Sequence, residues 1–458
     1  MRPGAELTSG SIPRRRFTFA LPILLGNVLQ SINGSVNAIW VGNFLGTAAL
    51  TATNNSNIVM FLLLGAVFGV TMASTILIAQ SVGARKVDEA RRVVGTSASF
   101  FFGLSLLFSL IGLWLSPAIL AWMGTPADAL PLGVTYMRVM FLALPASYAF
   151  FFVNAALRGA GDSRTPFAFL VLSVVLDIVL NPLLIFGLGP FPEMGIAGSA
   201  TATLVAQFVS VAALIGYIYR KRNPLTLRRA DAHLLRVDWG IVRTIVVKGI
   251  PMGLQMIVLS SSMVIFMRFV NQFGSDTAAA FAAAQQLWNY VQMPALALGA
   301  AVSSMAAQNI GAGLWDRVRE TARFGVLYNF LLTGVPVVLL YLASRPAIGI
   351  FLPADSPAIG IAVHLNLIVL WSFPLFGVSM VLSGVVRAAG AVVAPLLILA
   401  FALLVVRAPL AWLTVDRWGV DAVWWSFTIS AIVAMTLTVG YYLGGSWRSA
   451  RMSVAPGA

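Results

Sequence analysis

Apolar runs of about 20 residues or more recur along the whole chain, and no other feature limits its fold as strongly. A helix of this length crosses the hydrocarbon core of a bilayer. With 59% hydrophobic and only 10% charged residues, the chain lacks the polar residues needed to cover a water-soluble surface. The sequence therefore predicts an all-α integral membrane protein with twelve spans, at residues 17–40, 55–80, 94–122, 134–157, 165–188, 195–219, 244–270, 279–310, 323–343, 358–386, 392–414 and 420–444.

Few residues of the chain suit catalysis. It contains no cysteine, which excludes disulfides, thiolate metal sites and a cysteine nucleophile, and only two histidines, His233 and His364. We therefore expect no enzyme, no catalytic residue and no organic cofactor.

Basic residues gather in alternate loops. These loops and the N-terminus hold 24 of the 29 Lys and Arg residues, whereas the opposite loops hold only Arg345 and Arg417, and three arginines (Arg138, Arg268 and Arg407) fall within spans. Cytoplasmic loops carry such an excess of positive charge. The pattern predicts a multi-pass protein of the bacterial cytoplasmic (inner) membrane with both termini cytoplasmic. It also accounts for the net charge of +14 without a nucleic-acid partner.

The two halves of the chain repeat each other. Pro22 corresponds to Pro251 at an offset of 229, the segments 79–84 and 307–312 match at an offset of 228, and 158–161 matches 387–390 at 229. Six spans separate the copies, so the repeats run parallel about an axis along the membrane normal. The sequence predicts an N-lobe at 1–222, a cytoplasmic linker at 223–243 and a C-lobe at 244–458. These two six-helix lobes are expected to be related by a pseudo-twofold axis normal to the membrane.

One acid, Asp177, lies deep inside a predicted span, while the other acids fall in loops, in the N-terminal tail or beside span ends. In a helix, Asp177 would lie about 18 Å from the start of its run, near the bilayer midplane. An ionisable group at this depth usually marks an ion pathway or a binding site. The alternative is a protonated Asp that only hydrogen-bonds neighbouring helices.

The order of several short motifs resembles the multidrug and toxic compound extrusion (MATE) transporters. They are Val41-Gly42, Ala79-Gln80 with Gly83-Ala84, Arg158 with Gly161-Asp162 and Pro166, Asn181-Pro182, and Gly195-Ile-Ala-Gly198, with second-half equivalents at 308–313 and 387–390. The resemblance covers almost the whole chain. It implies antiport of a small-molecule substrate against Na⁺ or H⁺ by a rocker-switch movement of the two lobes, and we expect a monomer.

Two positions depart from that family pattern. Members commonly have an Asp in the first span where this chain has Asn37, and many have a Glu in the seventh span where it has Leu259. Asp177 matches the fifth-span Asp that lines the ion site in part of the family. The resemblance therefore implies that Asp177 carries the coupling without a first-span acid.

Polar residues at helical spacing surround this acid. Ser173, Asp177 and Asn181 share one helix face, as do Gln30, Asn33 and Asn37 in the first span, and Ser199, Thr203 and Gln207 in the sixth. Such oxygen-bearing groups suit Na⁺ or a proton site, although amides also hold membrane helices together without binding a ligand. The predicted cation-coupling residues are Asp177, Asn37, Ser173, Asn181 and Thr203.

A second group of residues suggests a substrate cavity. Amide, aromatic and methionine side chains together suit large apolar cations. The alternative is structural: amides also hold membrane helices together, Trp and Met also face lipid, and a lone His often only makes a structural hydrogen bond. The predicted cavity residues are Gln30, Asn33, Gln255, Gln285, Trp288, Asn289, Gln292, Met293 and His364.

Two rival functions remain open at this point. A flippase or exporter of lipid-linked oligosaccharides or metabolites should place Arg or Lys in the cleft, and only three arginines fall within spans. A membrane enzyme or receptor would need a nucleophile or metal cluster, or a seven-span layout. The antiporter is the function that the sequence favours.

Overall fold

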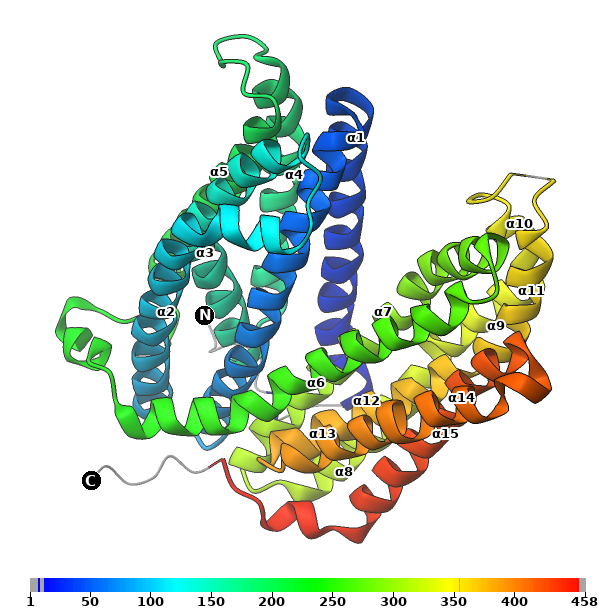
Figure 1. Cartoon of the computed structure of the whole chain (residues 1–458). Coiled ribbons are helices and arrows are strands. Elements are labelled where there is room, and N and C mark those ends of the chain that lie inside the picture. The colour runs from blue at the N-terminus through cyan, green and yellow to red at the C-terminus, as the bar shows by residue number, and fades with distance from the viewer. Residues whose placement is uncertain (1–6, 9–11, 354, 453–458) are drawn as a thin grey trace. The chain divides into compact units, whose positions relative to one another are not determined.

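The computed structural model describes residues 7–8, 12–353 and 355–452, and every regular element in these ranges is a helix (Figure 1). Eleven of the described helices are long and apolar enough to span a bilayer. The bent pair α11 and α12 raises the number to twelve if it is one span. The predicted all-α membrane fold is confirmed.

The chain divides into two compact units, and the described part of unit 1 is Leu25–Val246. The elements that contribute to it are α1 (Ile12–Gly83), α2 (Val87–Trp122), α3 (Leu130–Gly159), α4 (Arg164–Phe186), α5 (Ile196–Arg220), η1 (Arg229–Leu235) and the start of α6 (Trp239–Asn271). Unit 1 covers most of the range predicted for the N-lobe, and it also takes in the predicted linker and the first turns of α6.

Unit 2 comprises Leu7–Leu24 and Val247–Ser453. After α6 its elements are α7 (Ser275–Gly311), α8 (Trp315–Leu332), α9 (Gly334–Leu342), α10 (Ser344–Ile348), α11 (Ala358–Val369), α12 (Ser372–Ala388), α13 (Val393–Ala400), η2 (Phe401–Arg407), α14 (Ala408–Trp418), α15 (Val420–Gly444) and η3 (Ser446–Ser449). Its core holds six large buried aromatic residues: Phe266, Phe281, Trp288, Phe373, Trp424 and Phe427.

The first two spans differ from their predicted form. A loop is expected at residues 41–54, but helical structure continues through it, interrupted only where Gly46 takes φ 88° and ψ 178°. Glycine adopts a positive φ without the steric cost that a Cβ brings. One residue therefore makes the turn between the spans Thr18–Gly46 and Ala48–Gly83.

Proline explains the bend in the tenth span. α11 and α12 meet at 45°, and Pro374 lies in the first turn of α12. Proline has no N–H to donate and its ring clashes with the preceding turn. The helix therefore breaks just before Pro374.

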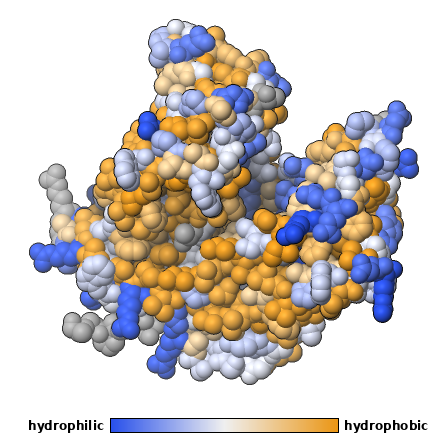
Figure 2. All heavy atoms as spheres, viewed as in Figure 1, coloured by the Kyte–Doolittle hydropathy of each residue, from blue (hydrophilic) through white to orange (hydrophobic). Residues whose placement is uncertain are grey.

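The surface of the helices is what a bilayer requires. Figure 2 shows apolar residues over most of the visible helix faces and hydrophilic residues mainly near the helix ends. Large exposed side chains such as Leu110, Trp114 and Val264 lie in the middle or outer parts of spans. Lipid tails solvate such residues, which would be unfavourable in water.

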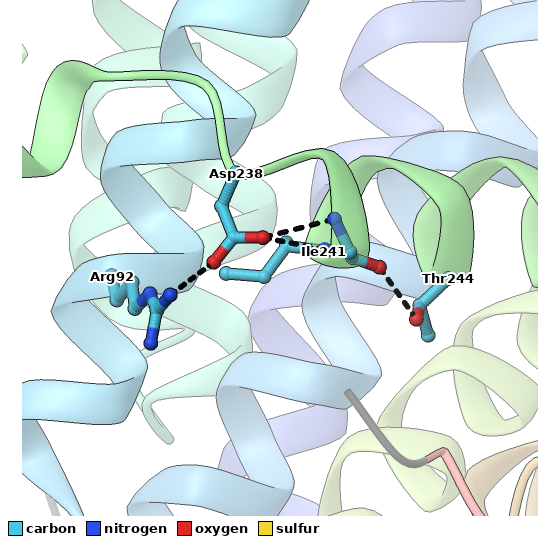
Figure 3. A network of polar contacts seen from close by, with 5 residues as sticks. Arg92, Asp238, Ile241 and Thr244 are labelled. Carbon is cyan, nitrogen blue, oxygen red and sulfur yellow. Dashed lines mark hydrogen bonds and ion pairs between the residues drawn. The ribbon is translucent and has the colours of Figure 1, made fainter. Parts of the chain in front are cut away.

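An acid–base pair holds the start of α6 against α2. Asp238 Oδ1 accepts hydrogen bonds from the backbone N–H of Gly240 at 2.9 Å and of Ile241 at 3.3 Å, and Oδ2 lies 2.5 Å from Arg92 Nη2 (Figure 3). Thr244 then donates to the Gly240 carbonyl at 2.9 Å. Asp238 is thus both the cap of α6 and its ionic anchor.

Replacing Asp238 separates these two roles. We expect Asp238→Ala to destabilise unit 1 by about 1–2 kcal/mol, because the cap is lost, and Asp238→Asn by less than about 1 kcal/mol, because Asn still caps and the ion pair is partly exposed. The measurement is the thermal midpoint of the purified protein in detergent. Equal loss in both variants would show that the ion pair, and not the cap, dominates.

Candidate functional site

Helix α4 presents Asp177 on its buried face, within unit 1. Asp162 Oδ1 accepts from the backbone N–H groups of Arg164 and Thr165 at 3.0 Å and so fixes the start of the helix. Its end is set by Gly187, which takes φ 66°. Asp177 lies about 20 Å along the axis from Arg164, at a rise of about 1.5 Å for each residue. Its side chain is 2% exposed.

Four hydrogen bonds converge on the Asp177 carboxylate from three helices. Oδ2 accepts from Asn33 Nδ2 at 2.8 Å and from Asn37 Nδ2 at 2.9 Å, both on α1. Oδ1 accepts from Thr203 Oγ1 on α5 at 3.0 Å and from Asn181 Nδ2 at 3.2 Å. A carboxylate offers about four acceptor positions, so neutral donors surround it without a basic residue.

Asn37 and Asn181 also bind each other. Asn181 Nδ2 donates to Asn37 Oδ1 at 2.9 Å and to the Asp177 backbone carbonyl at 3.0 Å. The two amides and the carboxylate therefore form a closed ring. Within it, Asn37 occupies the place where the family commonly has an acid, so the ring holds one carboxylate and not two.

A small cavity of about 30 Å³ adjoins the carboxylate. This volume is close to that of one water molecule and far below that of a drug-sized ligand. Two cavity residues have buried amide oxygens without a hydrogen-bond partner in the described structure, Asn33 Oδ1 and Gln207 Oε1. Asn181 Oδ1, beside the carboxylate, is another. Uncompensated oxygens beside a carboxylate suit a small hard cation.

All five residues predicted for cation coupling lie at this site. Asn37, Asn181 and Thr203 contact Asp177, and Ser173 lines the cavity. Gln30 and Asn33, which were predicted for the substrate cavity, line the same small space. No sequence signal pointed to Phe150 and Phe151 of α3, which also line the cavity, because a buried Phe and a lipid-facing Phe look alike in sequence.

Of the cavity residues predicted in the second half, five lie along α7 (Gln285, Trp288, Asn289, Gln292 and Met293), while Gln255 lies on α6 and His364 on α11. Trp288 is 2% exposed and donates to Asn366 Oδ1 at 2.9 Å, so its position favours packing. Gln255 Oε1 accepts from Arg387 Nη1 at 2.8 Å. Gln292 donates to Asn289 at 3.3 Å. The half-exposed His364 lies 2.8 Å from Asp421 Oδ1. Gln285 and Met293 are half-buried on α7.

A larger cavity of about 720 Å³ lies elsewhere in unit 1. Side chains of α2, α3 and α5 and of residues 223–235 form its walls, and most of them are apolar. None of the predicted site residues lines it. The size of a cavity therefore does not locate the ionisable group in this unit.

Bilayer-spanning helices, two repeated halves and an ion-sized cavity beside a buried acid define a polytopic membrane transporter. The MatE family model matches residues 22–183 and again 251–413. The chain belongs to this family, the multidrug and toxic compound extrusion transporters.

Individual relatives agree with that assignment. The chain is 36% identical to a probable multidrug resistance protein, YoeA, of Bacillus subtilis, over 94% of each chain. It is 31% identical to a second one, YpnP, from the same organism, over 98% of each. A solved structure of a MATE protein in complex with MaL6 superposes with a TM-score of 0.89 at 22% identity, covering 97% of this chain and 98% of the other.

Proposed function

We propose that the protein is a secondary active antiporter, which exports organic cationic or amphipathic small molecules in exchange for Na⁺ or H⁺. The observation that carries the proposal is the buried Asp177 carboxylate beside an ion-sized cavity, near the middle of the span Arg164–Phe186. Transport against a gradient needs a group whose affinity for the driving ion changes with conformation or with bound substrate. Among the described residues of unit 1, Asp177 is the acid placed for this role.

The residues present fit Na⁺ as a coupling ion. Asp177, Thr203 and Ser173, with the amide oxygens of Asn33 and Gln207, offer the hard oxygen ligands that Na⁺ prefers. The same carboxylate serves a proton equally well. We therefore propose that the coupling cation, Na⁺ or H⁺, binds at Asp177.

Substrate class and placement in the cell complete the proposal. Two relatives carry the words "multidrug resistance" in their names, which supports a broad range of organic substrates. Half-buried polar residues on α7, Gln285 and Gln292, remain candidates for contact with substrate. We propose a monomer in the bacterial cytoplasmic membrane with both termini cytoplasmic and no organic cofactor.

Reconstituted transport tests the proposal. In liposomes, we expect the protein to move rhodamine 123, a permanent organic cation, under an imposed Na⁺ gradient or an imposed pH gradient, and one of the two should increase the initial rate at least about tenfold over no gradient. Dye fluorescence measures the rate, and empty liposomes are the control.

The same vesicles distinguish the flippase. If neither gradient drives the dye while a fluorescent anionic lipid precursor equilibrates between leaflets, the antiporter is wrong. The intramembrane arginines would then be the first residues to examine.

A further inference from the structure

Arg407 is a cation placed in the middle of a membrane span of unit 2. The span runs from α13 through η2 to α14, Val393 to Trp418, so Arg407 lies about 20 Å from its start. η2 is a turn of π-helix, which widens the backbone by one residue and often accompanies a functional site. A charge at this depth is costly unless it meets a partner or a ligand.

The repeat makes Arg407 the counterpart of Asp177. α4 and α13 begin at Arg164 and Val393, an offset of 229. The two MatE matches begin at the same offset, at 22 and 251, but they end at an offset of 230, at 183 and 413. The second copy is thus one residue longer, and a π-helical turn accommodates one extra residue. At the offset of 230, Asp177 aligns with Arg407, the last residue of η2.

The neighbours of the two charges also correspond. α5 and α15 start from glycines of matching geometry, Gly195 with φ 53° and ψ −128° and Gly419 with φ 55° and ψ −137°. The offset between these glycines is 224, so Thr203 aligns with Phe427. The offset of 229 from Pro22 to Pro251 aligns Asn37 with Phe266.

The positions in unit 2 that correspond to Asp177 and its neighbours therefore carry residues of opposite chemical character. The Arg407 guanidinium carbon lies 3.9 Å from the centre of the Phe427 ring, and the rings of Phe427 and Phe266 meet edge to face at 4.4 Å. Where unit 1 places a carboxylate among hydroxyl and amide groups, unit 2 places a guanidinium against the Phe427 ring, which in turn packs on Phe266.

Contacts within the protein use only part of the hydrogen-bonding capacity of the Arg407 guanidinium. Nε donates to Ser430 Oγ at 2.9 Å, and one face of the group covers Phe427. Among the described residues no carboxylate lies within ion-pair distance of Arg407, and no hydrogen bond uses its two terminal nitrogens. Arginine has five N–H donors in a planar fork that matches a carboxylate or a phosphate.

We propose that Arg407 forms an anion-binding subsite in unit 2, which takes the carboxylate or phosphate group of a transported organic molecule. The ring of Phe427 holds the fork from one side, Ser430 fixes Nε, and the terminal nitrogens bind two oxygens of the ligand. The inference deepens the proposed function and rests on it, because it adds zwitterions and organic anions to the substrates of the same transporter.

Two dyes that differ in one group test the subsite. Rhodamine 110 has a free carboxylate, and rhodamine 123 is its methyl ester. We expect the purified full-length protein in detergent to bind rhodamine 110 more tightly, and Arg407→Gln to weaken rhodamine 110 binding at least about tenfold while rhodamine 123 binding changes less than about twofold. Fluorescence anisotropy measures both affinities. Arg407→Lys keeps the charge but loses the planar fork. Its affinity for rhodamine 110 should lie between those of the wild type and Arg407→Gln.

The matched control is Arg268→Gln, since Arg268 lies in a span of the same unit with an exposed side chain. It should leave both affinities unchanged. Equal weakening of both dyes in Arg407→Gln, or no preference for rhodamine 110 in the wild type, would overturn the proposal. Displacement of rhodamine 110 by phosphatidylglycerol added to the micelles would assign the site to a lipid headgroup and would also overturn it.

Equilibrium binding in detergent needs no gradient. If the protein shows no preference for the carboxylate dye but still transports rhodamine 123 under a gradient, only the proposed subsite is therefore wrong. Intact preference without driven transport would instead contradict the antiporter.

Discussion

Asp177→Asn should reduce gradient-driven export of rhodamine 123 at least about tenfold, close to the level of empty liposomes. Asn cannot release a proton, and it loses the negative charge that attracts Na⁺. The driving ion then binds the two conformations with nearly equal affinity, and such a ligand cannot bias their equilibrium. The initial rate of dye movement under Na⁺ and pH gradients is the measurement.

The variant should still fold. The substituted amide would bring a new NH₂ group to a site crowded with donors, but the partnerless Asn33 Oδ1 can accept from it after the amide rotates. Asp128→Asn is the matched control, because Asp128 is an exposed loop acid of the same unit. It should transport like the wild type. If Asp177→Asn does so too, Asp177 only holds helices together and coupling occurs elsewhere.

Gly198→Ala should lower both the stability of unit 1 and the rate of gradient-driven dye transport. A Cβ at Gly198 would lie 2.4 Å from the backbone oxygen of Leu184, far inside van der Waals contact, and a backbone atom at a helix crossing cannot turn aside. α5 must then move away from α4. Overpacking of this kind costs about 1–3 kcal/mol, and the movement lengthens the 3.0 Å bond from Thr203 to Asp177.

Gly216→Ala is the control on the same helix, since a Cβ there meets no atom within 4 Å. It should leave the thermal midpoint unchanged or raise it slightly, because Ala favours a helix over Gly by about 1 kcal/mol. Thermal unfolding in detergent and dye transport in liposomes measure the two effects. Equal thermal midpoints for the two variants would show that α4 and α5 can move apart at little cost in free energy.

Much of the site could be predicted because it depends on one helix at a time. The spacing of Ser173, Asp177 and Asn181 places them on one face of any helix, and the absence of acids from other span centres singles out Asp177. The same argument from spacing placed Asn33 and Asn37 on one face of the first span. Spacing within one helix does not show which helices pack against each other. Only the family resemblance indicated that these polar helix faces lie together.

In the second half, the structure adds contacts that spacing along a helix could not indicate. Trp288 and His364 look like cavity residues in sequence, but Trp288 packs in an aromatic core and His364 pairs with Asp421. The partners of both, Asn366 and Asp421, are distant in sequence. Arg407 was visible as a charge within a span, but its relation to Asp177 depends on one extra residue in the π-helical turn η2, which the residue types do not indicate.

The sequence by itself determined the membrane environment, the number of spans to within one, the repeat and the acid at depth. These follow from hydrophobicity, charge and spacing, which act along the chain. Only the tertiary structure decided that four donors from three helices enclose Asp177, that the adjoining cavity fits an ion, and that Arg407 lies over Phe427. Such contacts depend on how helices pack and on shifts of a single residue, and interior packing is too exacting to be inferred from residue types alone.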